Sequence, residues 1–381
     1  MNPKEKSERA AQVARLYYIQ NRSQKEIARE LNLENASSVS RLLKYARNQG
    51  IVKVEIQPVT RETPKRNQAL EAELLRSFDF LNAIVVEDVG YEGPFSPDKD
   101  EKLHSQLSKA LAEELRSMIR SGDHIGVTGG RGTYYTAVAL RTVSLPRLKQ
   151  SGVKISSLSG NVSSIAWTER MPVDADDVAY HFSCAFASAI LRRLSLPVAV
   201  ASRQALDEFL EKGQGIAISP EKWRKDKTLV PDIAIVGIGA LDISGPHRFL
   251  DLDGYELQPI KSELWKLIEM IKTFPYCPVG DIGYRLFYIE PPSTDIHIPA
   301  HRINALQNKI NTINNRILSI NSDQLRMIDV VVAVAGGPLK VNAIWQVLKN
   351  SEQGPLIQEL CTDDRTAQAL IKRFKKSERK A

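Results

Sequence analysis

The chain has 381 residues, 43% of them hydrophobic, and a formal charge of +7. This length allows one small module with one large domain, or two medium domains, and no apolar run approaches the roughly 18–20 residues that span a bilayer. The N-terminus, MNPKEKSERAA, lacks the apolar segment of a signal peptide. Cys184, Cys277 and Cys361 are isolated in sequence and suggest neither a zinc site nor a disulfide framework. We therefore expect a soluble cytoplasmic protein with no membrane partner.

The first predicted elements are three short helices. Residues 9–19 carry apolar side chains at helical spacing, and Ser23 with Glu26 has the spacing of a capping box that begins a second helix. A turn then leads to Asn35, a good cap for a third helix that ends at Gly50. The buried side of this third helix is predicted to consist of Val39, Leu42, Leu43 and Ala46.

The opposite side of the third helix has the size and chemistry of a major-groove reader. An ordinary amphipathic pair with a solvated face would look similar, but the charge distribution favours DNA. Residues 1–66 contain 14 Lys and Arg against 7 Glu, so this stretch carries the whole net charge. We predict a helix-turn-helix with operator DNA as its partner, contacted by Ser37, Ser38, Ser40, Arg41 and Lys44 and by Gln24 and Lys25 of the second helix.

A linker is predicted after this module. The segment IVKVEI, residues 51–56, alternates as a short strand does, whereas residues 57–66 are polar and contain Pro58 and Pro64. We expect a DNA-binding domain over residues 1–56, a linker over 57–66, and a metabolite-binding and oligomerisation domain over 67–381.

The large domain alternates strands with helices, which is typical of a mainly parallel, doubly wound α/β fold. Continuous β-branched runs predict the strands 197–201, 232–236 and 330–334, and apolar residues at helical spacing predict helices. The expected strands are 83–87, 124–127, 154–158, 197–201, 232–236 and 330–334. The expected helices are 67–78, 103–118, 176–194 and one containing Ile303, Leu306, Ile310 and Ile313.

Glycine-bearing turns are predicted at the carboxyl ends of three strands, where open α/β sheets bind ligands. They are residues 128–133, 237–240 and 335–340. The first opens a helix whose free N–H groups could hold an anion, with Arg131 beside them. In the third, Lys340 could meet a phosphate or a carboxylate. A tight structural turn and a solvent-exposed lysine remain open as alternatives.

Two further patterns were weighed. Asp174, Asp176 and Asp177 precede a predicted helix, where they could face a ligand or simply interact with the helix dipole. His297 and His301 lie four residues apart, but Pro299 between them breaks the geometry of a helical metal pair. We expect no metal and no cofactor.

Several segments resemble a known family. RSQKEIARELN and VSRLLKYARNQGIVKVEI resemble the DNA-binding start of the SorC/DeoR-type sugar-responsive bacterial regulators. GDHIGVTGGRGT, PDIAIVGIGAL, PVGDIGYRLF, VVVAVAGGPLKVNAI and LCTDDRTAQALI resemble successive blocks of that family's effector domain, so the resemblance spans nearly the whole chain. It implies an effector domain shaped like the phosphosugar isomerases and deaminases, a dimer or tetramer, and a phosphorylated sugar as inducer. The candidate effector-binding residues are Thr128, Gly129, Gly130, Arg131, Gly132, Thr133, Asn161, Asp176, Gly237, Gly239, Asp281, Gly336, Gly337 and Lys340.

The chain departs from the family pattern in four places. The turn of the helix-turn-helix looks one residue longer, and the first glycine loop reads GGRGTYY. The family's asparagine-rich segment appears as Asp174-Ala175-Asp176, whose carboxylates would repel a phosphate, so we expect an effector with at most one anionic group. Residues 291–321 look longer than expected, and their helix could serve as an oligomer contact or a lid.

The sequence therefore predicts a ligand-responsive DNA-binding regulator whose effector domain binds a sugar or a sugar derivative. The alternative is a sugar-phosphate isomerase or deaminase with an accessory N-terminal module. A basic module with a groove-reading helix favours the regulator, because a metabolic enzyme has no need of one. A purely structural interaction protein would leave the glycine turns at strand ends unexplained.

Overall fold

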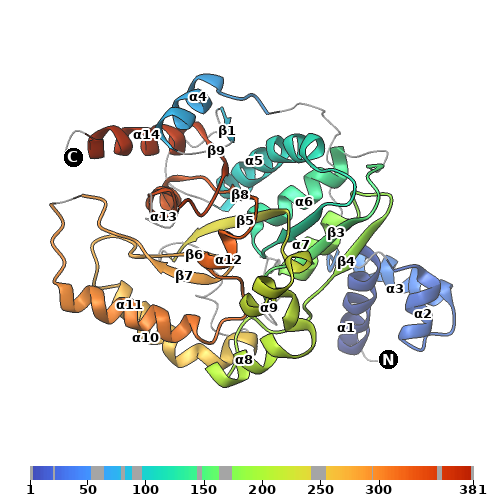
Figure 1. Ribbon diagram of the computed structural model, residues 1–381. Helices are drawn as coiled ribbons and strands as arrows, with labels where there is room; N and C mark the ends of the chain where they lie inside the picture. The colour runs from blue at the N-terminus through green and yellow to red at the C-terminus, as the bar shows by residue number, and fades with distance from the viewer. Residues whose placement is uncertain are drawn as a thin grey trace. The chain divides into compact units, whose positions relative to one another are not determined.

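The computed structural model describes two compact units, Met1–Glu62 and Thr63–Ala381 (Figure 1). The residues it describes are 3–19, 22–52, 64–78, 82–87, 97–143, 148–162, 174–241, 255–293, 295–349 and 354–378. Most of the predicted linker and of the strand expected at 51–56 lies outside them, and Ile51 and Val52 form bends. The exact domain boundaries therefore stay predictions.

The small unit is a helical module. It consists of α1 (Pro3–Ala14), which a π-helical turn (Arg15–Ile19) continues, α2 (Gln24–Glu30) and α3 (Ala36–Asn48). The predicted capping box is present, since the Ser23 N–H donates to Glu26 Oε2 at 2.8 Å and the Glu26 N–H to Ser23 Oγ at 3.3 Å. After α2, Asn32 adopts a φ of 49°, and the Leu33 N–H returns to the Ala28 carbonyl at 2.8 Å, which closes the helix end in the Schellman manner.

The three helices share one apolar core. The predicted buried side of α3 is confirmed, and it packs against apolar side chains of α1 and α2. The core consists of Ala10, Val13, Ala14, Leu16, Ile27, Ala28, Val39, Leu42, Leu43 and Ala46.

The large unit is built on a parallel sheet with the strand order β1-β9-β8-β5-β2-β3-β4. The strands are β1 (Asn82–Val86), β2 (His124–Val127), β3 (Val153–Ser157), β4 (Ala189–Arg192), β5 (Ile233–Ala240), β8 (Val330–Val334) and β9 (Glu359–Asp363). β6 (Val279–Ile282) and β7 (Arg285–Tyr288) form an antiparallel hairpin on the far end of β5. Since all parallel strands run in one direction, their carboxyl ends share one edge of the sheet.

Helices cover both faces, as the doubly wound prediction requires. One face packs on α5 (Pro97–Met118), α6 (Arg131–Val143) and α7 (Ala175–Ser183). The other packs on α4 (Gln68–Ser77), α8 (Arg203–Glu211), α9 (Pro220–Lys225), α12 (Ser322–Leu325), α13 (Val341–Leu348) and α14 (Asp364–Glu378). Successive residues of a strand point alternately to the two faces of the sheet. In β8, Val332 packs on the side of α5, α6 and α7, and Val331 packs on the opposite side. In Figure 1, α5 and α6 lie side by side.

A third apolar layer lies over the β6–β7 hairpin. It is formed by α10 (Lys261–Ile271) and α11 (Ala300–Asn314), which also lie side by side in Figure 1. Of the predicted stripe on α11, Leu306, Ile310 and Ile313 are buried in this layer, and Ile303 is half-buried. The apolar side of α11 is therefore part of the hydrophobic core of the large unit. Among the described residues, no helix combines the length and the apolar character needed to cross a membrane.

Three sequence predictions for this domain were wrong. The helix expected at 176–194 ends at Ser183, and the chain then forms the edge strand β4, where alternating exposure along AILR matches a strand at the sheet edge. The strand expected at 197–201 forms only isolated bridges, of Pro197 with Asn161 and Ala199 with Ile317. The glycine turn expected at 237–240 is part of β5, whose end leaves the parallel sheet to pair with β6.

Candidate functional site

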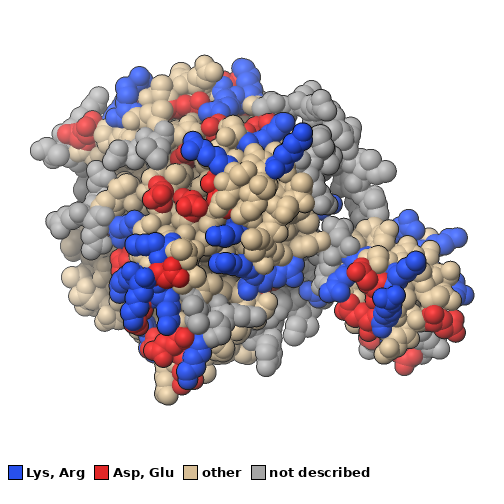
Figure 2. All heavy atoms as spheres, turned by 45° about the vertical axis from the view of Figure 1, so that its right-hand side comes forward, with Lys and Arg blue, Asp and Glu red and all other residues tan. Residues whose placement is uncertain are grey.

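The predicted DNA-contacting residues lie together on the exposed side of the helix-turn-helix. Ser37, Ser40, Arg41, Lys44 and Lys25 are exposed, and Ser38 and Gln24 are half-exposed. Asn35 caps α3 through the Ser38 N–H at 3.0 Å, and the Arg41 guanidinium donates to Ser38 Oγ at 3.1 Å. Figure 2 shows Lys and Arg side chains on the visible face of this unit, interspersed with acidic ones. The exposed side of α3 itself can offer hydroxyl, guanidinium and ammonium donors to a nucleic acid.

The first glycine loop joins β2 to α6. Gly130 has a φ of 145°, and the Thr133 hydroxyl donates to the Gly130 carbonyl at 2.9 Å, so the turn into the helix is tight. A side chain at Gly132 would place its Cβ 3.1 Å from the Val334 carbonyl oxygen and 3.6 Å from His104 Nδ1. A Cβ at this position would force the start of α6 and the end of β8 apart by a few tenths of an ångström, so the glycine allows their close approach.

The loop after β8 is held by β9. Gly337 has a φ of 95°, and its N–H donates to Asp363 Oδ2 at 2.8 Å and to Thr366 Oγ1 at 2.9 Å. A Cβ at Gly336 would lie 2.4 Å from the same Asp363 oxygen. Lys340 ends the short 3-10 helix Pro338–Lys340 that follows and precedes α13. Asp363 thus fixes the loop that carries the lysine.

These two loops bring cationic side chains to one place. His104, on α5, is 2% exposed, and the structure places it where the charges of Lys340 and Arg131 act on it. Burial first, and then these two cations, hold the pKa of the His104 imidazole well below its usual range, so this histidine stays neutral. Arg131 and Lys340 both follow strand ends and both lie near enough to His104 for their charges to act on its imidazole, and two such cations suit a single anionic group.

A polar wall adjoins the first loop. The Thr128 hydroxyl is fully buried and has no hydrogen-bond partner among the described residues, and the same holds for Asn161 Oδ1. The Gly129 N–H lies 3.4 Å from Ser159 Oγ, two residues before Asn161, which joins the two segments. A buried polar atom without a partner is costly in a folded protein. Both atoms therefore fit a role in binding a hydroxyl-bearing ligand.

Asp176 is engaged within the protein. Its carboxylate accepts hydrogen bonds from the Ser157 hydroxyl, from Asn161 Nδ2 at 2.7 Å, and from the N–H groups of Leu194 and Ser195 at 3.0 and 2.9 Å. It therefore orients the Asn161 amide and leaves Asn161 Oδ1 to face away from it. Asp174 caps α7 by accepting the Asp177 N–H at 2.9 Å.

The tip of the β6–β7 hairpin closes the other side of the first loop. Gly283 and Tyr284 have φ values of 54° and 70°, and the Tyr284 N–H donates to Asp281 Oδ2 at 3.1 Å. A Cβ at Gly129 would lie 3.0 Å from the Tyr284 hydroxyl. Asp281 therefore contributes by fixing a turn that packs on the loop, and Gly239 pairs with it across β5 and β6.

Sequence reasoning missed three residues at this site and misjudged one turn. His104 lies in an amphipathic helix, where its sequence position does not distinguish it from an ordinary core histidine. Asp363 and Tyr284 lie in two of the segments that resemble the family, but neither was predicted to contribute to the site. Gly237 and Gly239 lie within β5 and not in a turn. Among the described residues, no group of three or more potential ligands could hold a metal ion.

Comparisons with known proteins fit this architecture. Residues 62–261 and 307–372 match the family described as "Putative sugar-binding domain". The chain is 27% identical over 97% of its length to the deoxyribonucleoside regulator of Bacillus subtilis, covering 98% of that protein. It is 26% identical over 95% of its length to the erythritol catabolism regulatory protein EryD of Brucella abortus, covering 96% of it.

A solved structure shows the same fold at full length. The sorbitol operon regulator SorC of Klebsiella pneumoniae superposes with a TM-score of 0.56 at 23% identity, covering 96% of this chain and 99% of that one. These relatives are regulators, and they support a ligand-responsive DNA-binding regulator in place of the enzyme alternative. Because the matched segments make up more than half of the chain, the protein belongs to the family described as "Putative sugar-binding domain", and the relatives named above are transcriptional regulators.

Proposed function

We propose that this regulator binds a sugar or sugar derivative carrying one anionic group at the carboxyl ends of β2, β3 and β8. The observation that carries the proposal is the pairing of two kinds of group at this edge. Arg131 and Lys340 bring two positive charges to the corner beside His104, and Thr128 Oγ1 and Asn161 Oδ1 are buried polar atoms without a partner among the described residues. A phosphate or carboxylate suits the first pair, and hydroxyl groups suit the second.

Asp176 was predicted to contact the effector, but its carboxylate is already hydrogen-bonded within the protein. Its two oxygens already accept four donors, so we propose that it supports Asn161 and that Asn161 contacts the effector. In Asp176→Asn, one acceptor oxygen is replaced by a second amide donor facing Asn161 Nδ2. We expect this variant to lose roughly 2–4 kcal/mol of stability together with effector affinity. A stable variant that only gains affinity for doubly phosphorylated sugars would support direct contact between Asp176 and the effector.

The partners follow from the two units. We propose that α3 of the small unit reads operator DNA in the major groove, with Arg41 at a base edge and Lys44 at a phosphate. One such module buries little DNA surface, so we propose a dimer or tetramer that places two modules on paired half-sites. Its working compartment is the cytoplasm, where the operator and sugar metabolites are both present.

A ligand screen with matched variants tests the effector site. The two similar sequences are named as regulators of deoxyribonucleosides and of erythritol catabolism, and the similar solved structure is named as a sorbitol operon regulator. The panel is therefore deoxyribose 5-phosphate, erythritol 4-phosphate and sorbitol 6-phosphate, each beside its unphosphorylated form, read by thermal shift and calorimetry. We expect one phosphorylated compound to bind most tightly.

Two substitutions separate the parts of the site. Lys340→Met should lower affinity for the phosphorylated compound alone, whereas Thr128→Val should lower affinity for both forms. The controls are Lys349→Met, a surface lysine paired with Glu290, and Thr142→Val, whose hydroxyl bonds its own helix at 3.0 Å. Binding that Lys340→Met and Thr128→Val leave unchanged would place the effector elsewhere.

A further inference from the structure

The chain enters the large unit along the outer edge of β1. The Glu87 N–H donates to the Lys65 carbonyl and the Asn67 N–H to the Val85 carbonyl, each at 2.8 Å. Asn67 then caps α4 by accepting the Leu70 N–H at 3.1 Å. The last residues of the predicted linker, 65 and 66, and Asn67 after them are therefore attached directly to the sheet.

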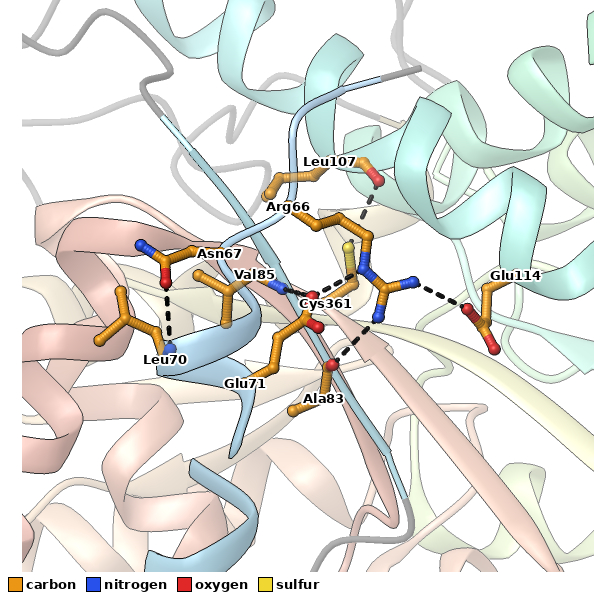
Figure 3. Close-up of polar contacts among 9 residues, drawn as sticks. All are labelled: Arg66, Asn67, Leu70, Glu71, Ala83, Val85, Leu107, Glu114 and Cys361. Atoms are coloured by element: carbon orange, nitrogen blue, oxygen red, sulfur yellow. Dashed lines mark hydrogen bonds and ion pairs between the residues drawn. The ribbon is translucent and has the colours of Figure 1, made fainter. Parts of the chain in front are cut away.

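Arg66, in the middle of this attachment, binds three elements at once (Figure 3). Its Nε donates to Glu71 Oε1 of α4 at 2.7 Å, its Nη1 to Glu114 Oε2 of α5 at 3.1 Å, and its Nη2 to the Ala83 carbonyl of β1 at 3.4 Å. Glu71 is 8% exposed, and its Oε1 also accepts the Val85 N–H at 2.9 Å. We call Arg66 with Glu71, Glu114 and the Ala83 carbonyl the Arg66 anchor.

One of the anchored helices also forms the back of the effector site. On α5, His104 lies 3.6 Å from the Cβ position of Gly132, and Leu107 Cδ1 lies 3.1 Å from that of Gly336, so α5 contacts both loops. Cys361 Sγ donates to the Leu107 carbonyl at 3.3 Å, which also ties this part of α5 to β9. Glu114 follows His104 by ten residues on the same helix, a rise of about 15 Å. Any shift of α5 at the effector loops must therefore be accommodated at Arg66.

We infer that the Arg66 anchor couples the effector site to the DNA-binding unit, with α5 as the connecting element and Glu114 as a positioning residue. The inference rests on the proposed function, because it concerns how that site controls operator binding. The guanidinium holds α4, α5 and β1 in one fixed geometry at the point where the linker enters. An effector that moves the loops beside His104 and Leu107 moves α5, and the Arg66–Glu114 contact passes that movement to the chain that leads to the helix-turn-helix.

A purely structural anchor predicts something different. Partly buried ion pairs often contribute little net stability, and loss of such a pair would change the unfolding midpoint while leaving the coupling between two ligands intact. The discriminating quantity is therefore the factor by which the effector changes operator affinity.

The experiment uses the full chain and two substitutions on α5. The DNA probe is a duplex selected from a random library by the wild type, and the effector probe is the panel compound with the largest thermal shift. Operator affinity is measured by fluorescence anisotropy with and without saturating probe, and probe affinity by calorimetry. Glu114→Ala removes the Arg66 contact. Glu113→Ala is the control, because the only ion pair of Glu113 with a described residue is a long one, 3.9 Å from Arg116.

We expect the probe to change wild-type operator affinity at least fivefold. In Glu114→Ala the probe should change operator affinity by less than twofold. The affinity for the probe, and the operator affinity measured without the probe, should each stay within threefold of wild type. Glu113→Ala should keep the full factor. Arg66→Lys is a second variant, since one ammonium cannot hold all three partners, and it should also reduce the factor.

Other results overturn the inference. A full coupling factor in Glu114→Ala refutes it while leaving the proposed function intact. Loss of probe affinity in Glu114→Ala would make the contact part of the binding site and would also refute it. If the wild type binds no panel compound, or binds one without any change in operator affinity, the proposed function and the inference fail together.

Discussion

Glu359, at the start of β9, should make the stability of the large unit fall as pH rises. The residue is 6% exposed, and its Oε2 has no hydrogen-bond partner among the described residues. Burial, and then the neighbouring charge of Glu114, raise the pKa of the Glu359 carboxyl from 4.5 to about 7, against a hydrogen bond with the Asn82 side chain that lowers it. Glu359→Gln keeps an acceptor for Asn82 and removes the ionisation.

The sign and the size follow from linkage. Below the pKa of the unfolded chain, the Glu359 carboxyl is protonated in both the folded and the unfolded protein, so it does not destabilise the fold. Between pH 4.5 and about 7 the unfolded carboxyl ionises while the folded one stays neutral, so the penalty grows and is complete above the folded value. At about 1.4 kcal/mol for each pKa unit, Glu359→Gln should be more stable than wild type by roughly 2–4 kcal/mol near pH 8 and by much less near pH 5.

Denaturant unfolding followed by tryptophan fluorescence measures this difference. All four tryptophans lie beyond residue 66, so the signal reports the large unit alone. Glu113→Gln, with a side chain 40% exposed, is the control and should stay close to wild type at both pH values. A difference between Glu359→Gln and wild type that does not grow with pH would refute the reasoning.

Three further outcomes are expected. Arg41→Ala should cost about 1–3 kcal/mol of operator-binding free energy and reduce specificity at one base pair. Lys44→Ala should lower affinity for all DNA sequences alike and make affinity less dependent on salt, and anisotropy across a salt series measures both variants. Gly336→Ala should lose more than roughly 2 kcal/mol of stability, because its Cβ would meet Asp363 at 2.4 Å; Gly237→Ala, with no atom within 4 Å of its Cβ, should change stability by less than about 0.5 kcal/mol. Light scattering at micromolar concentration should show at least a dimer, and a monomer that still binds one half-site tightly would contradict the proposed assembly.

Local rules predicted the small unit well because its signals are local. Ser23 and Glu26 form the capping box, Asn35 caps α3, and the stripe of α3 is buried as its spacing predicts. The strand 330–334 was also located correctly, since VVVAV is the nearly continuous β-branched run expected of a buried parallel strand. In each case residues a few positions apart carry the whole signal.

Tertiary context decided the rest. Gly237 and Gly239 look like a turn, but Gly237 pairs with Val334 of β8 and Gly239 with Asp281 of β6, so β5 stays extended through both. The segment after Ser183 has helical composition, and pairing with β3 makes it the strand β4 instead. At the site, Arg131 and Lys340 could be proposed from their loops, whereas the approach of His104 to both depends on how α5 packs, which no local pattern reveals.

The most direct test of the account is the effect of the effector on operator binding by the full chain. A duplex selected from a random library is titrated with wild-type protein, with and without each sugar phosphate of the panel, and turnover of each compound is followed in parallel. The account predicts that one singly phosphorylated compound changes operator affinity by roughly 5–150-fold, corresponding to about 1–3 kcal/mol of coupling, and that it is recovered unchanged. Conversion of a sugar phosphate with no effect on DNA binding would contradict it.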